Sequence, residues 1–498
     1  MSSDLKSKTI SGVSWKFAER ICAQGVSTIV AIVLARILMP SDYAVVSIVT
    51  IFFTFANVFI SGGFSSALIQ KKETDWLDYS SVLHISFLTA LILYAVMFFL
   101  APVIAKLYDI SILVPIIRVM GLTFFINAVK SVVCAYVSHR MQFKKFFFAT
   151  IIGTVISAIV GIWMAKTGFG AWALVAQQMV NSFIDTVILF ITTKFKIIFK
   201  ISMPKIKVLF KYGWKVFVTS IISVTYDEAS PLIVGIRYTT EDLAYYTKGK
   251  SFPTFFGGSL SDTFAGVLLP AMSKVQDDKV AVLKYLRNFM RLTSYTVFPV
   301  LIGFLAVSDS FVRVVLTEKW MFASFFIKIF CITEMLRIIN TGNLQAIYAI
   351  GRSDVTLVME IIKKSSYAVV LVLFVIFAGS VEVFALSAIT TSIIAALVNS
   401  FPNRKLLNYR YRLQVWDLLP NFIIAGIMGV IVYFMNYINI NNALLLLLQI
   451  VSGAVIYSVL SILTKNKNFI FLLDLIKERR TKRNDKKVVK ETDATKKA

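Results

Sequence analysis

The chain has 498 residues, 57% of them hydrophobic, a formal net charge of +25 and a mean hydropathy of +0.77. Soluble globular proteins are about 45 to 50% apolar, so this composition excludes a soluble fold and predicts a protein that crosses a membrane many times. The positive charge does not indicate a nucleic-acid partner, because the Lys and Arg residues are concentrated in alternate loops between the apolar runs.

Fourteen apolar runs predict fourteen membrane helices in an all-α polytopic protein. In chain order we place them at residues 11–38, 43–69, 80–104, 112–137, 146–166, 170–193, 209–235, 251–272, 288–308, 322–350, 355–379, 382–401, 418–437 and 443–463. The loops on one side of these helices hold most of the Lys and Arg residues, which predicts that both ends of the chain are cytoplasmic. The excess charge is then a topological signal that also contacts anionic membrane lipids.

A repeat with an offset of about 200 residues relates the first six helices to the next six. Trp15 matches Trp214 at an offset of 199, and Asp42 matches Asp242 at an offset of 200. A membrane protein built from two halves is the design that such a repeat predicts. We therefore expect an N-terminal six-helix lobe at 1–193, a basic cytoplasmic linker at 194–211, a C-terminal six-helix lobe at 209–401, two accessory helices at 402–463 and a basic cytoplasmic tail at 464–498.

Polar side chains form a stripe on the first helix. Lys16, Arg20 and Gln24 are spaced by four residues and so share one helical face. A Lys or Arg near the centre of a membrane helix costs roughly 2.5 to 3.5 kcal/mol on insertion scales, so this face should line an interior cavity rather than contact lipid. The stripe therefore predicts that polar ligands bind in this cavity.

Four later helices carry polar residues that we assign to the same cavity. They are Lys130 on the fourth helix, Gln177 and Asn181 on the sixth, Thr219 and Ser223 on the seventh, and Glu334 and Arg337 on the tenth. Glu334 and Arg337 are three residues apart, which predicts a salt bridge within one helix. Because Arg and Lys supply the donors that phosphate oxygens accept, a cationic cavity would suit an anionic head group such as a diphosphate.

Enzyme signatures are scarce in this sequence. The two histidines, His84 and His139, lie far apart, and neither belongs to a metal-ligand pattern; we interpret His139 as a solvated loop residue. There is no GxxxxGK[ST] loop, so direct nucleotide hydrolysis is not expected. We predict a protein that is not an enzyme and that binds no metal and no cofactor. An ion gradient or the gradient of the substrate would drive any transport.

Several short motifs resemble a known family. They are Gly12, Trp15, Arg20 and Gln24, the LAR at 34–36, Leu38, Pro40 and Asp42, the ALIQKK at 67–72, the RMQF at 140–143 and the WALV at 172–175. In their order and spacing they are similar to the polysaccharide-transporter branch of the multidrug/oligosaccharidyl-lipid/polysaccharide (MOP) exporter superfamily, and within it to the Wzx-type and teichuronic-acid-type flippases. The resemblance covers the first twelve helices.

This resemblance implies a flippase of the bacterial inner membrane. Such a protein would move an undecaprenyl-diphosphate-linked oligosaccharide to the outer leaflet by alternating access, for surface polysaccharide such as lipopolysaccharide or exopolysaccharide. A polysaccharide polymerase and chain-length machinery are the implied protein partners. The resemblance also implies a central cationic cavity, with Arg20 as its arginine on the first helix. Asp227 and Glu228 depart from that pattern, and we regard them as candidates for coupling to protons or sodium ions.

Other functions fit parts of the sequence. A lipid II flippase would also need cations around a diphosphate. A drug or cation antiporter of the same superfamily would favour a cavity dominated by acidic residues, which is not what the sequence shows. A membrane glycosyltransferase or polymerase would resemble a many-helix protein with a large external loop, and the outside loops predicted here are short. A scaffold without transport would not need charges on several helices.

Overall fold

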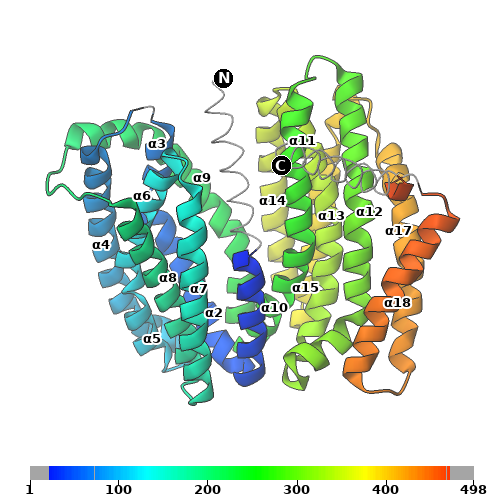
Figure 1. The fold of residues 1–498 in the computed structure, drawn as a ribbon, viewed down its shortest axis with the longest axis horizontal. Helices are drawn as coiled ribbons and strands as arrows, with labels where there is room; N and C mark the ends of the chain where they lie inside the picture. Colours follow the sequence, from blue (N-terminus) through cyan, green and yellow to red (C-terminus); the bar gives the residue numbers. More distant parts are fainter. Residues whose placement is uncertain (1–21, 72, 467, 471–498) are drawn as a thin grey trace, which may run out of the picture. The chain divides into compact units, whose positions relative to one another are not determined.

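The computed structural model describes residues 22–71, 73–466 and 468–470, and these residues form helices and connecting segments with no strand. The chain divides between Thr247 and Lys248 into two compact units, which we call unit 1 and unit 2. Figure 1 draws unit 1 in blue to green and unit 2 in green to red. Ten helices in the described part of the chain are long and apolar enough to cross a membrane. The protein is therefore a multi-pass membrane protein, as its composition predicts.

Unit 1 is a helical bundle. Its elements are a helix at Cys22–Ile37, α2 (Pro40–Ser61), α3 (Phe64–Gln70), α4 (Trp76–Tyr108), α5 (Leu113–Met120), α6 (Thr123–His139), α7 (Phe143–Lys166), α8 (Ala171–Thr193), α9 (Met203–Arg237) and the start of α10 (Thr240–Pro253). Helices α7 and α8 pack along each other, and α6 packs against α4 and α8. Helix α9 packs against α2, α3 and α4. The lobe limits drawn from the sequence repeat, which separate α9 from these helices, stay a prediction.

Unit 2 is also a helical bundle. It contains the end of α10, the π-helical turn η1 (Thr254–Gly258), α11 (Ser259–Ser273), α12 (Lys279–Phe311), η2 (Val312–Leu316), η3 (Glu318–Trp320), α13 (Ala323–Ala349), α14 (Ser353–Phe377), α15 (Val381–Ser400), α16 (Asn403–Leu406), α17 (Tyr411–Phe434), η4 (Met435–Tyr437) and α18 (Asn442–Leu463). Helix α12 packs against α13 and α17, α13 packs against α15, and α18 packs against both α12 and α17.

The structure breaks two helices that the sequence predicts as continuous. The predicted helix 43–69 is interrupted at Gly62 and Gly63, which have φ angles of 51° and 72°. A Cβ atom added to Gly63 would lie 2.0 Å from the carbonyl oxygen of Gly213 on α9. The break therefore lets the backbone of α3 meet the backbone of α9. The predicted helix 112–137 is interrupted near Gly121, between α5 and α6. The count of fourteen membrane-crossing helices stays a prediction.

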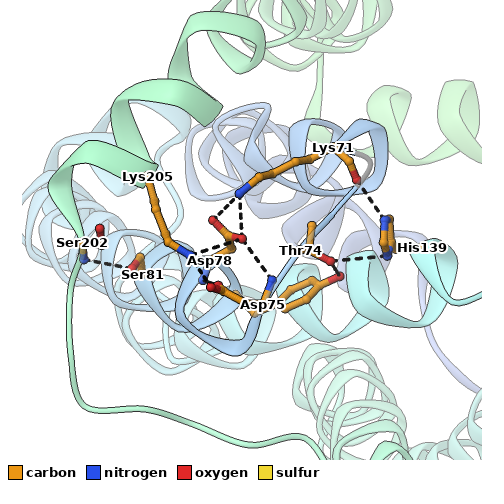
Figure 2. Close-up of polar contacts among 9 residues, drawn as sticks. Lys71, Thr74, Asp75, Asp78, Ser81, His139, Ser202 and Lys205 are labelled. Carbon is orange, nitrogen blue, oxygen red and sulfur yellow. Dashed lines mark hydrogen bonds and ion pairs between the residues drawn. The ribbon is translucent and has the colours of Figure 1, made fainter.

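An ion-pair cluster at the start of α4 fixes the position of α9. We call it the α4 clamp; it consists of Lys71, Asp75, Asp78, His139 and Lys205 (Figure 2). The carboxylate of Asp78 is 1% exposed, and Lys71 Nζ lies 2.7 Å from each of its oxygens. Lys205, from the first turns of α9, pairs with Asp75 and lies 3.7 Å from Asp78. The clamp thus ties α3, α4 and α9 together.

Three further hydrogen bonds extend the clamp. The backbone N–H groups of Ile198 and Ser202 donate to the hydroxyls of Ser80 and Ser81 at 2.9 and 3.0 Å, so the segment before α9 is fastened to α4. His139 Nε2 donates to the carbonyl oxygen of Lys71 at 2.9 Å. His139 is half-buried, so our interpretation of it as a solvated loop residue is wrong. Sequence spacing could not reveal a partner 68 residues away.

The α4 clamp predicts a pH-dependent contribution to stability. The hydrogen bond from Lys205 holds the pKa of Asp75 at about 2, below the usual value of about 3.9. Because the pKa is lower in the folded state, the contribution is fully present above about pH 4 and is lost as the pH falls toward 2. The Asp75 side chain is 58% exposed, so solvent screening limits this contribution to about 1 kcal/mol or less.

We expect Asp75→Asn to lower the melting temperature of the detergent-purified protein slightly at pH 7 and by less at pH 3. Asp75 also caps α4 by accepting a hydrogen bond from the Asp78 N–H at 2.8 Å, and Asn caps a helix about as well, so the variant isolates the charge. A difference of the same size at both pH values would contradict the role of the ionised carboxylate.

Candidate functional site

The structure describes most, but not all, of the predicted cavity residues. Lys16 and Arg20 lie outside the described residues. Gln24 lies on the helix Cys22–Ile37, where its side chain is exposed and its carbonyl oxygen accepts a hydrogen bond from Thr28 at 2.8 Å. The stripe predicted for the first helix therefore stays a prediction.

One face of α9 lines a mostly apolar pocket of about 610 Å³ that also contains polar side chains. Thr219 and Ser223, both predicted, line it together with Lys215, because residues four apart share a helical face. The remaining lining residues are Val58, Tyr212, Val216, Ser220 and Val224. The pocket thus combines one cation and four hydroxyl-bearing side chains from α9 with an apolar wall.

Two of the hydroxyl groups in this pocket already make hydrogen bonds within α9. Thr219 Oγ1 donates to the Lys215 carbonyl at 2.8 Å, and Ser223 Oγ donates to the Thr219 carbonyl at 3.0 Å. Each hydroxyl oxygen keeps its acceptor lone pairs and can take a second hydrogen bond. The ammonium group of Lys215 is exposed and makes no ion pair with any described residue. The pocket can therefore bind an anion through the Lys215 ammonium. The Thr219 and Ser223 hydroxyls can accept hydrogen bonds from the hydroxyls of a sugar.

A second polar cluster lies between α6 and α8. Lys130 Nζ lies 2.6 Å from Asp185 Oδ2, so the charge of this predicted residue is neutralised. The predicted Asn181 is nearby on α8, and its Oδ1 atom is buried with no hydrogen-bond partner among the described residues. An unpartnered buried amide oxygen is costly unless a ligand or water supplies a donor. Asn127 on α6 donates to Asn57 on α2 at 2.9 Å, which extends the polar seam.

The predicted residue Gln177 packs against a neighbouring helix and does not belong to either polar cluster. It lies on α8 against Gly161 of α7, where an added Cβ would come within 2.9 Å of the Gln177 Cβ. Gly153 plays the same part opposite Asn181, since a Cβ there would lie 3.2 Å from its Oδ1. Small residues on α7 thus let it approach α8 closely.

A third cluster lies in unit 2 and contains Glu334 and Arg337. Their side chains are 3.5 Å apart, which confirms the salt bridge predicted from their spacing. A second carboxylate completes the cluster: Arg337 Nη2 lies 2.9 Å from Asp262 Oδ1 on α11. Thr254 donates to Glu334 Oε1 at 3.2 Å. One guanidinium is therefore shared by two carboxylates, and the cluster carries no surplus of positive charge.

The π-helical turn η1 makes room for this cluster. A Cβ on Gly257 would lie 3.0 Å from the Glu334 Cβ, and one on Gly258 would lie 3.0 Å from Arg337 Nη1. Both glycines are buried. Single π-helical turns within α-helices are frequent at functional sites. The turn, the glycines and the two carboxylates together mark unit 2's candidate site.

Asp227 and Glu228 lie on α9, beyond the pocket. Asp227 is exposed and Glu228 is half-buried. Helix α9 runs on through Pro231 to Arg237 without a break. Their predicted role in ion coupling stays a prediction.

Two functional candidates were missed by reasoning from sequence. Thr254 and Asp262 contact the predicted residues Glu334 and Arg337, which lie about 75 to 80 residues further along the chain. On α14, Lys363 Nζ lies 2.6 Å from Glu360 Oε1. Charged residues three apart on an apolar helix are visible in the sequence, so this pair could have been predicted.

The chain is similar to proteins of polysaccharide biosynthesis and transport in three bacteria. It is 22% identical over 326 residues to the succinoglycan biosynthesis transport protein ExoT of Rhizobium meliloti (strain 1021), covering 65% of this chain and 66% of ExoT. It is 22% identical over 442 residues to the lipopolysaccharide biosynthesis protein WzxC of Escherichia coli (strain K12), covering 86% and 89% of the two chains. With the teichuronic acid biosynthesis protein TuaB of Bacillus subtilis (strain 168) it is 20% identical over 467 residues, covering 90% and 94%.

Solved structures share the fold. The lipid II flippase MurJ in an inward closed conformation gives a TM-score of 0.74 at 18% identity, covering 94% of this chain and 100% of MurJ. An inward-facing multidrug resistance MATE family transporter of the MOP superfamily gives a TM-score of 0.58 at 13% identity, covering 79% and 98%. The fold is therefore the one seen in MurJ and MATE transporters, which confirms the MOP/MATE-like fold expected from the sequence.

The family itself follows from the sequence match. The model of the family described as "Polysaccharide biosynthesis protein" matches residues 33–324, a stretch that covers α2 to α12 and more than half of the chain. The chain belongs to the family of polysaccharide biosynthesis proteins.

Proposed function

We propose that this protein is a flippase that moves an undecaprenyl-diphosphate-linked oligosaccharide across the bacterial inner membrane by alternating access. The observation that carries the proposal is the α9 pocket, which sets the ammonium of Lys215 beside the hydroxyls of Thr219 and Ser223 on a membrane helix. A charge on such a helix is costly unless it serves a polar ligand or cavity. An ammonium suits a diphosphate, and hydroxyls suit a sugar. The names of the relatives ExoT, WzxC and TuaB support a polysaccharide precursor over lipid II.

The architecture that we propose has fourteen membrane helices and two six-helix lobes related by the sequence repeat. Two structural observations support the repeat. Asp42 accepts a hydrogen bond from the Met39 N–H at 2.9 Å where α2 begins, and Asp242, 200 residues later, accepts one from the Thr239 N–H at 3.0 Å where α10 begins. The same helix start is thus built at both repeat positions.

A second observation is a contact between equivalent residues. The hydroxyls of Ser47 and Thr247 lie 3.4 Å apart, and the two residues are separated by the repeat offset of 200. In a two-fold arrangement, a residue at the axis contacts its own counterpart. The contact brings together two positions that the sequence repeat relates, which supports the repeat.

The remaining features of the proposal come from the sequence and the relatives. Both termini are cytoplasmic, the protein has no catalytic activity, and Asp227 and Glu228 couple transport to an ion gradient. Gln24, Lys130, Gln177, Asn181, Glu334 and Arg337 line the route of the substrate together with Lys16 and Arg20. A polysaccharide polymerase and chain-length machinery take up the product on the outer face.

The proposal predicts that Lys215→Ala lowers surface polysaccharide at least about tenfold in the bacterium that carries this gene, because a charge-assisted hydrogen bond contributes about 1.5 to 3 kcal/mol. Lipid-linked precursor should accumulate, as measured by mass spectrometry of extracted lipids. Lys215→Arg keeps the charge and should retain most of the polymer.

A matched control is available on the same helix. Lys207 is exposed on α9 but does not line the pocket, so Lys207→Ala should leave the polymer unchanged. Wild-type polymer in the Lys215→Ala strain, at a wild-type level of the protein in the membrane, would refute a role of this pocket in transport.

A further inference from the structure

Unit 2 contains a pocket of about 680 Å³ that none of the predicted cavity residues lines. It lies between α12, α17 and the turn that follows α18. Its lining residues are Asn288, Arg291, Leu292, Trp416, Asp417, Pro420, Asn421, Ile423, Ile424, Thr464, Lys465, Asn466 and Asn468. We call it the α12–α17 pocket. Cations and amides make up one part of its wall, and proline, leucine and isoleucine side chains make up another.

The pocket has a surplus of positive charge. The Asp417 carboxylate is 1% exposed and binds two guanidinium groups, with Arg287 Nε at 2.8 Å and Arg291 Nη2 at 2.5 Å. Tyr409 donates to the same carboxylate at 2.8 Å. One negative charge therefore stands against two arginines, and the exposed Lys465 adds a third cation at the pocket wall. The site favours an anionic ligand.

Hydrogen bonds make the polar wall rigid. Asn421, which is buried, donates to the Arg291 carbonyl at 2.9 Å and to Ser294 Oγ at 2.8 Å. Asn466 in turn donates to Asn421 Oδ1 at 3.1 Å, which fixes the turn carrying Lys465 against α17. The fixed turn holds Lys465 near Arg291 before any ligand binds, so little ordering is required on binding.

The mouth of the pocket is suited to a membrane lipid. Trp416 is 57% exposed and Ile423 is 49% exposed, and both line the pocket. Exposed tryptophans are typical of the membrane interface, where one part of the ring is in an apolar environment. This end of α12, α17 and α18 is the end that the Lys and Arg distribution predicts to be cytoplasmic, facing the leaflet in which anionic lipids attract basic residues.

We propose that the α12–α17 pocket binds the phosphate head group of an anionic phospholipid of the surrounding membrane. Arg291 and Lys465 contact the phosphate, the exposed Asn288 side chain donates to the glycerol or phosphate oxygens, and the acyl chains lie along Ile423 and Trp416. The ligand is a structural lipid of unit 2, so the inference does not depend on the transported substrate.

The test uses the full-length protein purified in detergent and native mass spectrometry. Phosphatidylglycerol is titrated against wild-type protein, and zwitterionic phosphatidylcholine is titrated in parallel. We expect one phosphatidylglycerol to bind more tightly than the others and more tightly than phosphatidylcholine. The substitution Lys465→Gln should weaken this binding about fivefold, which is the effect of one Lys near a lipid phosphate.

Lys279→Gln serves as the matched control. Lys279 is an exposed lysine of α12 that does not line the pocket, so its replacement should leave the tight binding unchanged. Asn288→Ala is a second test at an exposed position that tolerates substitution, and it should weaken binding without affecting folding.

Three outcomes would overturn the proposal. Equal affinity for phosphatidylglycerol and phosphatidylcholine would remove the role of the positive charge. Displacement of phosphatidylglycerol by a lower concentration of undecaprenyl diphosphate, lost in Lys465→Gln, would assign the pocket to the polyprenyl lipid. Displacement by inorganic phosphate at millimolar concentration would show that a free anion is the ligand. Wild-type polymer in the Lys215→Ala strain would refute the proposed transport role but would change none of these outcomes.

Discussion

Gly63→Ala is expected to abolish most of the folded protein in the membrane. Gly63 has a φ angle of 72°, a conformation that costs an L-residue about 1 to 2 kcal/mol. Its Cβ would also lie 2.0 Å from the Gly213 carbonyl oxygen, and neither backbone can yield without separating α3 from α9. Overpacking adds about 1 to 3 kcal/mol, and the sum is a large fraction of the 5 to 15 kcal/mol that stabilises a typical domain.

Two further glycines allow the strain and the clash to be separated. Gly168 has a φ angle of 86° with nothing within 4 Å of an added Cβ, so Gly168→Ala carries the conformational strain alone. In Gly213→Ala the Cβ would lie 3.2 Å from Gly63 atoms without a positive φ, so its effect should be intermediate. The measurement is the amount of monodisperse protein on size-exclusion chromatography of a fluorescent fusion. Equal yields of the Gly63→Ala and Gly168→Ala proteins would show that the backbone contact does not matter.

Asp417→Asn is expected to lower the melting temperature of the purified protein by several degrees. The substitution removes the carboxylate that neutralises Arg287 and Arg291 and leaves both guanidinium groups without their anion. Removing one partner of a buried ion pair costs about 3 to 5 kcal/mol, and the partial exposure of the two arginines puts the expected loss near the lower value.

The matched control is an ion pair of the same chemistry in a different environment. Asp354 binds Arg352 through three hydrogen bonds of 2.8 to 3.2 Å, but their side chains are 64% and 48% exposed. Asp354→Asn should leave the melting temperature unchanged, because exposed pairs contribute little. A fall in melting temperature equal to that of Asp417→Asn would mean that burial does not determine the value of these pairs.

The sequence alone predicts the positions of the helices well, for a physical reason. Each apolar run long enough to span a membrane must satisfy its backbone hydrogen bonds internally, so it forms a helix. The ends of helices are harder to predict than their positions. Helix α17 begins at Tyr411, whereas the apolar run begins at residue 418. The buried Asp417 was missed because it precedes that run by one residue. The breaks at Gly62 and Gly121 were missed because they depend on neighbouring helices.

The partners of the charged residues could not be predicted from one sequence. Spacing within a helix predicted the contact of Glu334 with Arg337, because helix geometry fixes it. The pairing of Lys130 with Asp185 spans two helices, and the pairing of Arg337 with Asp262 spans 75 residues. These contacts depend on which helices lie together, which hydropathy does not encode. Lys130 and Arg337, two of the predicted cavity cations, thus have carboxylate partners that the sequence did not indicate, while the cationic cavity as a whole stays a prediction.

Helix α9 is fully buried only near its two ends. Its buried residues are Ile206, Leu209 and Gly213 near the start and Ser230, Pro231, Val234 and Gly235 near the finish, with none from 214 to 229. The middle of the helix contacts α2, for example through the Phe217 and Phe59 rings at 5.1 Å, but it is packed less tightly than the two ends and can bend more easily than they can. Lys215, Thr219 and Ser223 all lie in this middle part, so a small change in its curvature would alter the separation of the ammonium and hydroxyl groups while the ends stay in place.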